Sequence, residues 1–145
     1  MTLSCRSTST PNMPALNIEH IACNVKDPAA MAAWYVDNLG MRIIRKSPTP
    51  PYIHFLADAN GHAVIEIYSN AADPVPDYSK MHPLRFHVAF ATSDPDGSRA
   101  ALVGAGATAV DDQTLADGSR LIMLRDPWGL PLQLCKRTTP LLVAG

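Results

Sequence analysis

Two histidines, each followed at the same interval by an oxygen-bearing side chain, are the residues of this 145-residue sequence best suited to chemistry. His20 precedes Glu66 by 46 residues, and His87 precedes Gln133 by 46 residues, so a shift of 67 positions superimposes the two pairs. Together they would offer a metal ion two nitrogen and two oxygen ligands, with coordination positions left open. Such a set suits zinc, nickel, cobalt, manganese or iron(II) better than calcium. The ion could polarise a carbonyl group or lower the pKa of bound water.

The same shift also superimposes the elements that would position these side chains. Asp27-Pro28 falls on Asp94-Pro95, and each pair follows a strand-like run, at 17–25 and 84–92. Aspartate suits a helix N-cap and proline the first helical position, so each pair predicts a helix start. We expect the first helix to end at Gly40 and the second near Gly104 and Gly106. Three further strands are predicted in each half: 41–46, 52–57 and 62–69, then 107–111, 119–125 and 130–136.

Strand alternation separates an apolar face from a face that carries the four candidate ligands. In 84–90 the even positions are large and apolar, whereas His87 points the other way. Ile65 and Ile67 oppose Glu66 in the same manner, and Leu132 and Leu134 oppose Gln133. The apolar faces should carry the helices, and the opposite faces should leave room for an ion and its ligand. The substrate-pocket candidates near these positions are Tyr68, Asn70 and Cys135.

Each of these residues also has a purely structural interpretation. A histidine in a strand is often a satisfied structural residue, and Glu66 could be a solubility device on an edge strand. Cys135 could be a small buried hydrophobe, and the spacing of Trp34 and Tyr35 favours helix core. The remaining histidines are expected to be surface or pocket-lining residues rather than ligands: His54, His62 and His82.

Composition sets the class of protein and the organisation of the chain. The net charge of −1 offers no basic field for nucleic acid, and no apolar stretch is long enough to cross a membrane. Three separated cysteines suggest no disulfide framework and suit a cytoplasmic protein. We expect a disordered tail at 1–15, with Met13 as a possible alternative start, one domain at 16–137 and a C-terminal tail at 138–145. The domain divides into a first module (16–69), a connector (70–83) and a second module (84–137).

Residues 16–137 resemble the vicinal oxygen chelate superfamily, which groups glyoxalase I, methylmalonyl-CoA epimerase, extradiol dioxygenases, fosfomycin-resistance thiol transferases and bleomycin-resistance proteins. The resemblance rests on five segments: IEHIA at 18–22, WYVDNLGM at 34–41, VIEIY at 64–68, FHVAF at 86–90 and DPWGLPLQL at 126–134. It implies an α+β fold of two tandem βαβββ modules, whose cupped mixed sheet surrounds a metal and carries helices on its outer face. It also implies a homodimer.

The resemblance further implies that His20, Glu66, His87 and Gln133 are the ligands of one divalent ion, and that Glu66 is the base that transfers a proton. Extradiol dioxygenases and thiol transferases use a carboxylate on the final strand, where this chain has Gln133. The ligand pattern is therefore more similar to that of glyoxalase I. Only half of the glutathione signature of that enzyme is present, because Asn24 replaces its arginine whereas Asn70 matches.

Three functions follow as hypotheses. In the first, the protein is a metal-dependent lyase or isomerase acting on a small substrate with vicinal oxygens through an enolate-type intermediate, and Glu66 takes and returns the proton. In the second, it is a metal-free protein that binds a small molecule of the antibiotic type. In the third, it is an iron(II) dioxygenase that uses His20, His87 and Glu66. The cup could close within one chain or between two.

Overall fold

The computed structural model describes residues 14–142, so the predicted tail at 1–15 lies almost wholly outside the described residues, as do Met13 and the end of the C-terminal tail. The first module contains β1 (Ile21–Asn24), α1 (Pro28–Leu39), β2 (Arg42–Lys46), β3 (His54–Ala57) and β4 (Val64–Tyr68). A short 3-10 helix, η1 (Tyr78–Lys80), lies in the connector. The second module contains β5 (Val88–Ala91), α2 (Pro95–Gly104), β6 (Thr108–Thr114), β7 (Arg120–Arg125) and β8 (Pro131–Lys136).

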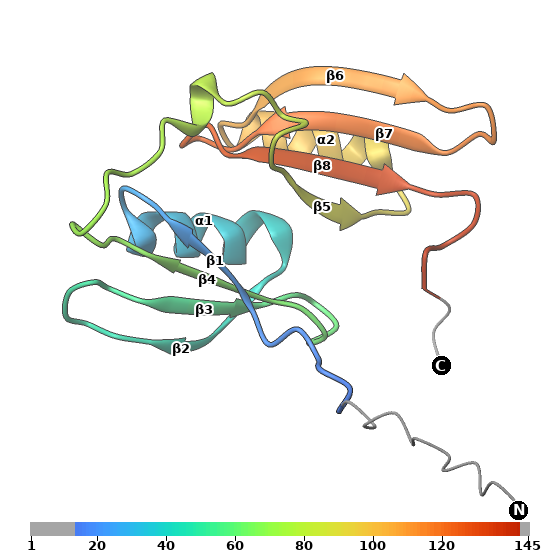
Figure 1. Ribbon diagram of the computed structural model, residues 1–145. Coiled ribbons are helices and arrows are strands. Elements are labelled where there is room, and N and C mark those ends of the chain that lie inside the picture. Colours follow the sequence, from blue (N-terminus) through green and yellow to red (C-terminus); the bar gives the residue numbers. More distant parts are fainter. Residues whose placement is uncertain (1–13, 143–145) are drawn as a thin grey trace, which may run out of the picture.

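Each module is a four-stranded mixed sheet with one helix, so the predicted α+β class and the tandem βαβββ repeat are confirmed (Figure 1). The strand orders are β1-β4-β3-β2 and β5-β8-β7-β6. In each sheet the first strand runs parallel to the last, and the other neighbours are antiparallel. The registers place Ala22 opposite Glu66 and Ala89 opposite Gln133, so the 67-residue repeat holds at the level of strand pairing.

Both helices begin where the Asp-Pro pairs predict. The Asp27 carboxylate accepts a hydrogen bond from the Ala30 amide at 3.0 Å, and Asp94 accepts one from the Gly97 amide at the same distance. These bonds satisfy amides that have no partner within the helix. Gly40 ends α1 with a φ of 67°, a left-handed conformation that glycine adopts without steric cost.

The first strand of each module is shorter than predicted. β1 begins at Ile21 rather than at residue 17, because the parallel partner strand β4 begins at Val64. β5 begins at Val88 rather than at residue 84. Its parallel partner β8 begins with Pro131, which has no N–H to donate to an earlier part of the strand. His20 and His87 therefore lie immediately before their strands rather than within them.

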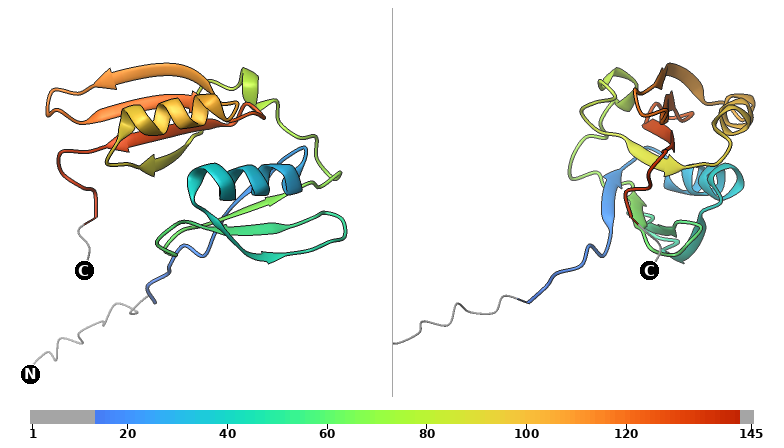
Figure 2. Two further views of the ribbon diagram at one scale, coloured as in Figure 1. Left: turned by 180° about the vertical axis from the view of Figure 1, so that it is seen from behind. Right: turned by 90° about the vertical axis from the view of Figure 1, so that its right-hand side faces the viewer.

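Helix α1 packs against both modules. Figures 1 and 2 show it between the two sheets, with α2 on one face of the second sheet. One core cluster joins Met31 and Tyr35 of α1 to Leu130 and Leu132 of the second module. Trp34, as predicted, is part of the core, and its indole N–H donates to the Ala105 carbonyl oxygen at 2.9 Å.

The structure corrects one expectation about the remaining histidines. His54 is neither a surface nor a pocket-lining residue, because it is only 7% exposed and shares the parity of Leu56, which faces the helix. Its Nδ1 atom bonds the Tyr52 carbonyl oxygen at 2.8 Å, which satisfies the buried ring. His62 and His82 are exposed, as expected.

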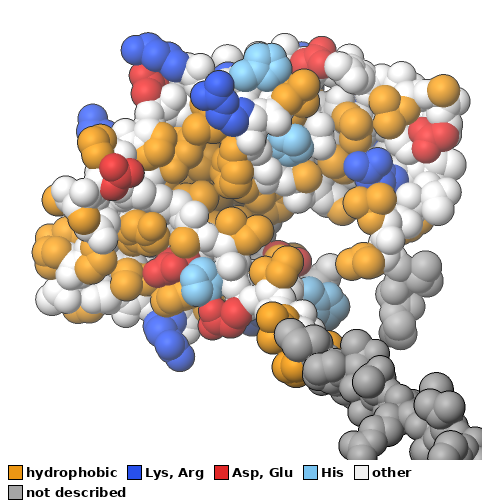
Figure 3. Space-filling view, viewed as in Figure 1, with side chains coloured by type: hydrophobic (Ala, Val, Ile, Leu, Met, Phe, Trp, Pro, Cys, Tyr) orange, Lys and Arg blue, Asp and Glu red, His pale blue; other side chains and the backbone are white. Residues whose placement is uncertain are grey.

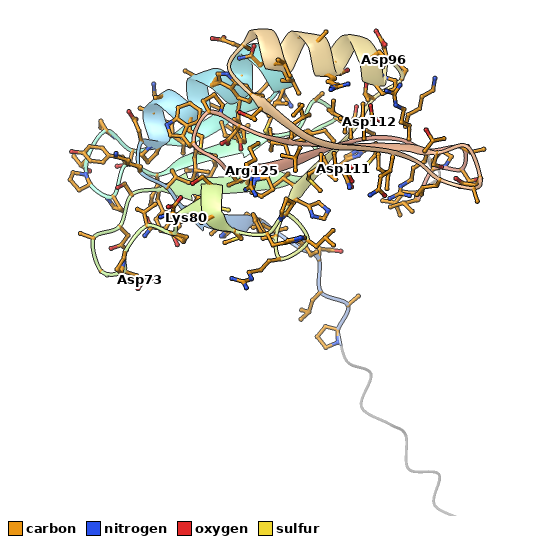
Figure 4. The ribbon with its side chains drawn as sticks, turned by 90° about the horizontal axis from the view of Figure 1, so that it is seen from above. Asp73, Lys80, Asp96, Asp111, Asp112 and Arg125 are labelled. Carbon is orange, nitrogen blue, oxygen red and sulfur yellow. The ribbon has the colours of Figure 1, made fainter. Side chains whose placement is uncertain are left out.

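The connector is fastened to both modules. The Tyr78 hydroxyl donates to the Asn24 carbonyl oxygen at 2.8 Å. The Arg125 guanidinium lies beside η1, which carries Lys80 (Figure 4), and donates to the carbonyl oxygens of Tyr78, Met81 and Gly129 at 2.8, 2.7 and 3.0 Å. In the described chain, no helix is both long enough and apolar enough to cross a membrane.

Candidate metal and substrate site

His20 and Glu66 come into direct contact on the face of the first sheet that lies opposite α1. The His20 Nε2 atom is 3.1 Å from the Glu66 Oε2 atom, and the Glu66 side chain is only 14% exposed. The parallel pairing of β1 and β4 produces this contact, because it sets Glu66 beside Ala22, whose small side chain leaves the space above it open. Two residues 46 positions apart in the sequence are thereby brought together as predicted.

The orientation of His20 is set from the other side of its ring. The Nδ1 atom contacts the Glu19 carboxylate, which leaves Nε2 directed toward Glu66. The hydrogen bond with Glu19 is the main cause that raises the pKa of His20 above 6.5, and the charge of Glu66 acts in the same direction, while burial opposes both. The two carboxylates therefore favour the charged form of the imidazole in the metal-free protein.

His87 and Gln133 lie on the corresponding face of the second sheet. The His87 Nδ1 atom donates to the Pro83 carbonyl oxygen at 2.9 Å, an arrangement that leaves the Nε2 lone pair free. Gln133 is half-buried, and its Oε1 atom accepts a hydrogen bond from the Cys135 thiol at 3.3 Å. In both modules the histidine is thus held through Nδ1 and presents Nε2.

The two pairs do not form one cluster in a single chain. Residues 14–142 hold no group of three or more His, Cys, Asp or Glu side chains placed to bind a metal ion, so His87 does not join His20 and Glu66 in such a group. The His20–Glu66 pair by itself has the geometry of two neighbouring ligands. Donor atoms bound at about 2.0–2.2 Å to one ion lie about 3 Å apart, and the observed separation is 3.1 Å. We call the pairs His20–Glu66 and His87–Gln133 the two candidate half-sites.

The other pocket candidates have different roles. Asn70 lies beyond the sheet, where its amide N–H donates to the Asn24 side-chain oxygen at 2.9 Å and its own side chain accepts from the Ala72 amide. Asn24 also donates to the Asn70 and Asp73 carbonyl oxygens, so the two asparagines fix the start of the connector. Cys135 is buried, and burial raises the pKa of its thiol, which argues against a reactive thiolate. Tyr68 is half-buried at the end of β4.

Sequence reasoning missed the aromatic floor of the first half-site. The Phe55 ring lies edge-on to the His20 ring, with centroids 5.5 Å apart, and β3 pairs Phe55 directly with Glu66. The strand pattern does show that Phe55 points to the opposite face from Leu56, and therefore to the face of the candidate ligands. Its place beside Glu66 could not be predicted, because the register of β3 against β4 depends on the hairpin that joins them.

A groove of about 650 Å³ opens between the modules. Its walls come from β1, the end of α1, β4, β5 and α2, and apolar side chains such as Ile21, Ile65, Val88 and Phe90 line much of it. Hydrophobic side chains gather between the modules on the face seen in Figure 3. A smaller cavity of about 360 Å³ lies under the connector, beside Tyr78 and Trp128.

A family model described as the Glyoxalase/Bleomycin resistance protein/Dioxygenase superfamily matches residues 17–134. The chain belongs to this superfamily. The match covers both modules and all four candidate ligands. A search of curated proteins gave no significant sequence match.

Solved structures of superfamily proteins share the fold. A glyoxalase family protein from Enterococcus faecalis is 27% identical, with a TM-score of 0.63 over 83% of this chain and 97% of that chain. A glyoxalase family protein from Bacillus cereus is 15% identical, with a TM-score of 0.73 over 88% and 97% of the two chains. TnmS3, an antibiotic binding protein from Streptomyces sp. CB03234, is 17% identical, with a TM-score of 0.65 over 84% and 96%.

Proposed function

We propose that this superfamily member is a metal-dependent lyase or isomerase of the glyoxalase type, acting on a small substrate with vicinal oxygens. The observation that carries the proposal is the 3.1 Å contact between His20 Nε2 and Glu66 Oε2 on an open sheet face. A carboxylate that touches an imidazole, beside an alanine rather than a bulky residue, is suited both to ligation and to proton transfer. The ions suited to these ligands are zinc, nickel, cobalt, manganese and iron.

The residues of the chain divide the chemistry between them. A divalent ion held at this site would act as a Lewis acid on a carbonyl oxygen of the substrate, which makes the adjacent C–H more acidic. Glu66 accepts the proton from that carbon at its carboxylate and returns it to the substrate. His20 orients Glu66 and is itself oriented by Glu19 through Nδ1. His87, held through the Pro83 carbonyl oxygen, and Gln133 supply the remaining ligands.

We further propose that two copies of the chain complete the site as a homodimer. The segments that carry the two histidines expose apolar side chains: Ile18 is 84% exposed, Ile21 54% and Leu84 76%. β1 and β5 are also edge strands, whose unpaired backbone groups are available to a neighbouring chain. In such an arrangement His20 and Glu66 of one copy face His87 and Gln133 of the other, and a twofold axis generates two equal sites.

The experiment combines metal analysis with proton exchange. Protein purified without chelator is expected to carry about one ion per chain, a ratio that His20→Ala lowers sharply. Loss of solvent-exchangeable C–H signal is followed by NMR in D2O for a panel of small 2-oxo and 2-hydroxy carbonyl compounds. Glu66→Gln keeps an oxygen ligand but removes the base, so exchange should fall by about 10²-fold or more while metal content is retained. Asp111→Asn is the control, because Asp111 is an exposed carboxylate on β6 that bonds Gln113 and does not contact His20 or Glu66, so this variant should retain most of the exchange activity.

A metal content below about one ion per two chains in wild-type protein would leave the proposed reaction without its electrophile. Equal exchange by wild type and Glu66→Gln would likewise remove Glu66 from the mechanism.

A second candidate function is stoichiometric binding of an antibiotic-type small molecule without metal. The groove of about 650 Å³ and its apolar lining favour it, because drug-sized ligands occupy pockets of about this size. The structural similarity to the antibiotic binding protein TnmS3 points in the same direction. Ligand affinity that is unchanged by chelation, with no turnover, would select this function over the first.

A further inference from the structure

One row of residues crosses the first sheet from edge to edge on the face that carries Glu66. Strand pairing aligns Arg45 of β2 with Phe55 of β3, Phe55 with Glu66 of β4, and Glu66 with Ala22 of β1. With neighbouring strands about 4.8 Å apart, the backbones of Arg45 and Glu66 are separated by about 10 Å. Along the row a cation, an aromatic ring and a carboxylate follow one another, and the small Ala22 occupies the edge beyond the carboxylate.

The Phe55 ring lies close to both Arg45 and His20. The Arg45 guanidinium carbon lies over the ring, 6.0 Å from its centroid, which is a cation–π arrangement. His20, the partner of Glu66, meets the same ring edge-on. The guanidinium of this exposed residue therefore lies over the open sheet face.

Arg45 has no acidic partner within residues 14–142, as is also true of Arg42 and Arg85, and its position over the Phe55 ring is what sets it apart. Arg120 donates to Asp96 and Asp112, which lie near the start of α2 in Figure 4, and Arg99 pairs with Asp112. Arg125 donates to three carbonyl oxygens. Over residues 14–142 Arg45 makes no salt bridge and no side-chain hydrogen bond, although its planar group can bind a carboxylate through two parallel bonds.

We propose that Arg45 is a specificity-determining residue that binds the carboxylate of an aromatic or conjugated substrate, whose planar body lies on Phe55 and whose reacting carbon reaches Glu66. This inference rests on the proposed function for the identity of the reacting end, but the anion subsite itself requires no metal. The separation of about 10 Å between the two backbones sets the substrate length to a ring, or a short conjugated chain, between the carboxylate and the acidic C–H.

The charges on the row give the orientation of the substrate. Glu66 repels a carboxylate, and Arg45 attracts it from the opposite end, so an anionic substrate has one favoured direction along the row. The aromatic ring of Phe55 favours a flat body over a branched one, because stacked or edge-on ring contacts add to the burial of apolar area.

The test uses benzoate and its uncharged analogue benzamide as probes of full-length protein from which metal has been removed by chelation. Both are titrated by NMR, with the backbone amide shifts locating the site. Arg45→Gln removes the guanidinium. Lys46→Gln is the matched control. Lys46 is the neighbouring cation on the same exposed strand, but it pairs with the buried His54, so its position belongs to the opposite face of the sheet from Arg45.

Benzoate should bind with shifts in β2 and β3, and benzamide at least about tenfold more weakly. Arg45→Gln should raise the Kd of benzoate at least about fivefold and leave that of benzamide within about twofold, which also shows that the variant is folded. Lys46→Gln should change neither by more than about twofold.

The inference is overturned if wild-type protein does not bind benzoate, if benzamide binds equally well, or if the two variants weaken benzoate binding to the same extent. Its failure is separable from failure of the proposed function. Benzoate binding that depends on Arg45, together with wild-type protein that carries no metal when purified without chelator, would contradict only the lyase or isomerase proposal. A protein that carries metal and catalyses exchange, but whose Kd for benzoate is unchanged by Arg45→Gln, would contradict only the anion subsite.

Discussion

Asp126 is the residue at which the two modules are locked together. Its carboxylate is buried, and it accepts hydrogen bonds from the Tyr35 hydroxyl at 2.8 Å and from the amides of Trp128 and Leu130 at 2.9 Å. Burial raises the pKa of Asp126 above 3.8, and these hydrogen bonds oppose that shift. The native state therefore holds this proton to a higher pH than the unfolded chain, and ionisation of Asp126 lowers stability as the pH rises above 3.8.

Tyr35→Phe should destabilise the protein by about 1–3 kcal/mol, because it leaves a buried carboxylate oxygen without its donor. The loss should be larger at pH 7 than at pH 4. Removing a bond that stabilises the ionised form raises the pKa of Asp126 further, so the penalty grows as the group ionises. Urea unfolding at the two pH values measures this difference. Tyr52→Phe is the control, because Tyr52 is 44% exposed and should shift stability by no more than about 0.5 kcal/mol. Equal losses at the two pH values would contradict the assignment.

At the residue scale, the sequence predicted which face of a strand a residue occupies better than which residues it contacts. Strand parity placed Glu66 and Gln133 on the open faces, because a period of two is set by the backbone alone. It could not pair Phe55 with Arg45 and Glu66, since this pairing depends on hairpin geometry and on the register shift between Ile43 and Arg45. The role of Asp126 could not be predicted either, because its bond to Tyr35 joins residues 91 positions apart.

The connector acts as a strap over the hairpin between β7 and β8. Gly129 has a φ of 88°, and a Cβ atom built on it would lie 2.7–2.8 Å from the backbone of Ser79. Asp126, Pro127, Trp128 and Gly129 form the turn of this hairpin, which is closed by a hydrogen bond from the Gly129 amide to the Asp126 carbonyl oxygen at 2.9 Å. The close approach of the strap could not be predicted, because it depends on where the connector runs.

Gly129→Ala should destabilise the protein by about 2–4 kcal/mol, because it combines a left-handed backbone with a clash against backbone atoms that cannot rotate away. Thermal or urea unfolding measures the loss. Gly104→Ala is the matched control. It lies in α2 with no atom within 4 Å of the added Cβ, so it should be neutral or stabilise by up to about 1 kcal/mol. Similar stabilities for the two variants would show that the connector is not held tightly over Gly129.

At the scale of the whole molecule, the internal repeat predicted two modules but not how they face one another. The helix caps and the strand order follow from local chemistry, and most element bounds lie within a few residues of those predicted. The packing of α1 between the modules depends on long-range contacts, such as Met31 with Leu130, that leave no periodic signal. For the same reason the sequence left open whether the two half-sites meet within a chain or between chains. In the described part of one chain they form no joint group of three His, Cys, Asp or Glu side chains that could hold a metal ion.

The measurement that tests the central claim most directly is metal binding by a mixture of two inactive variants. His20→Ala damages the first half-site and His87→Ala the second, so neither variant alone should hold an ion. If one ion is shared between copies, unfolding and refolding an equal mixture produces mixed dimers with one intact site of two. The mixture should then recover about a quarter of the wild-type metal content. No recovery above the separate variants, in refolded mixtures shown to contain mixed dimers, would contradict a site shared between two copies.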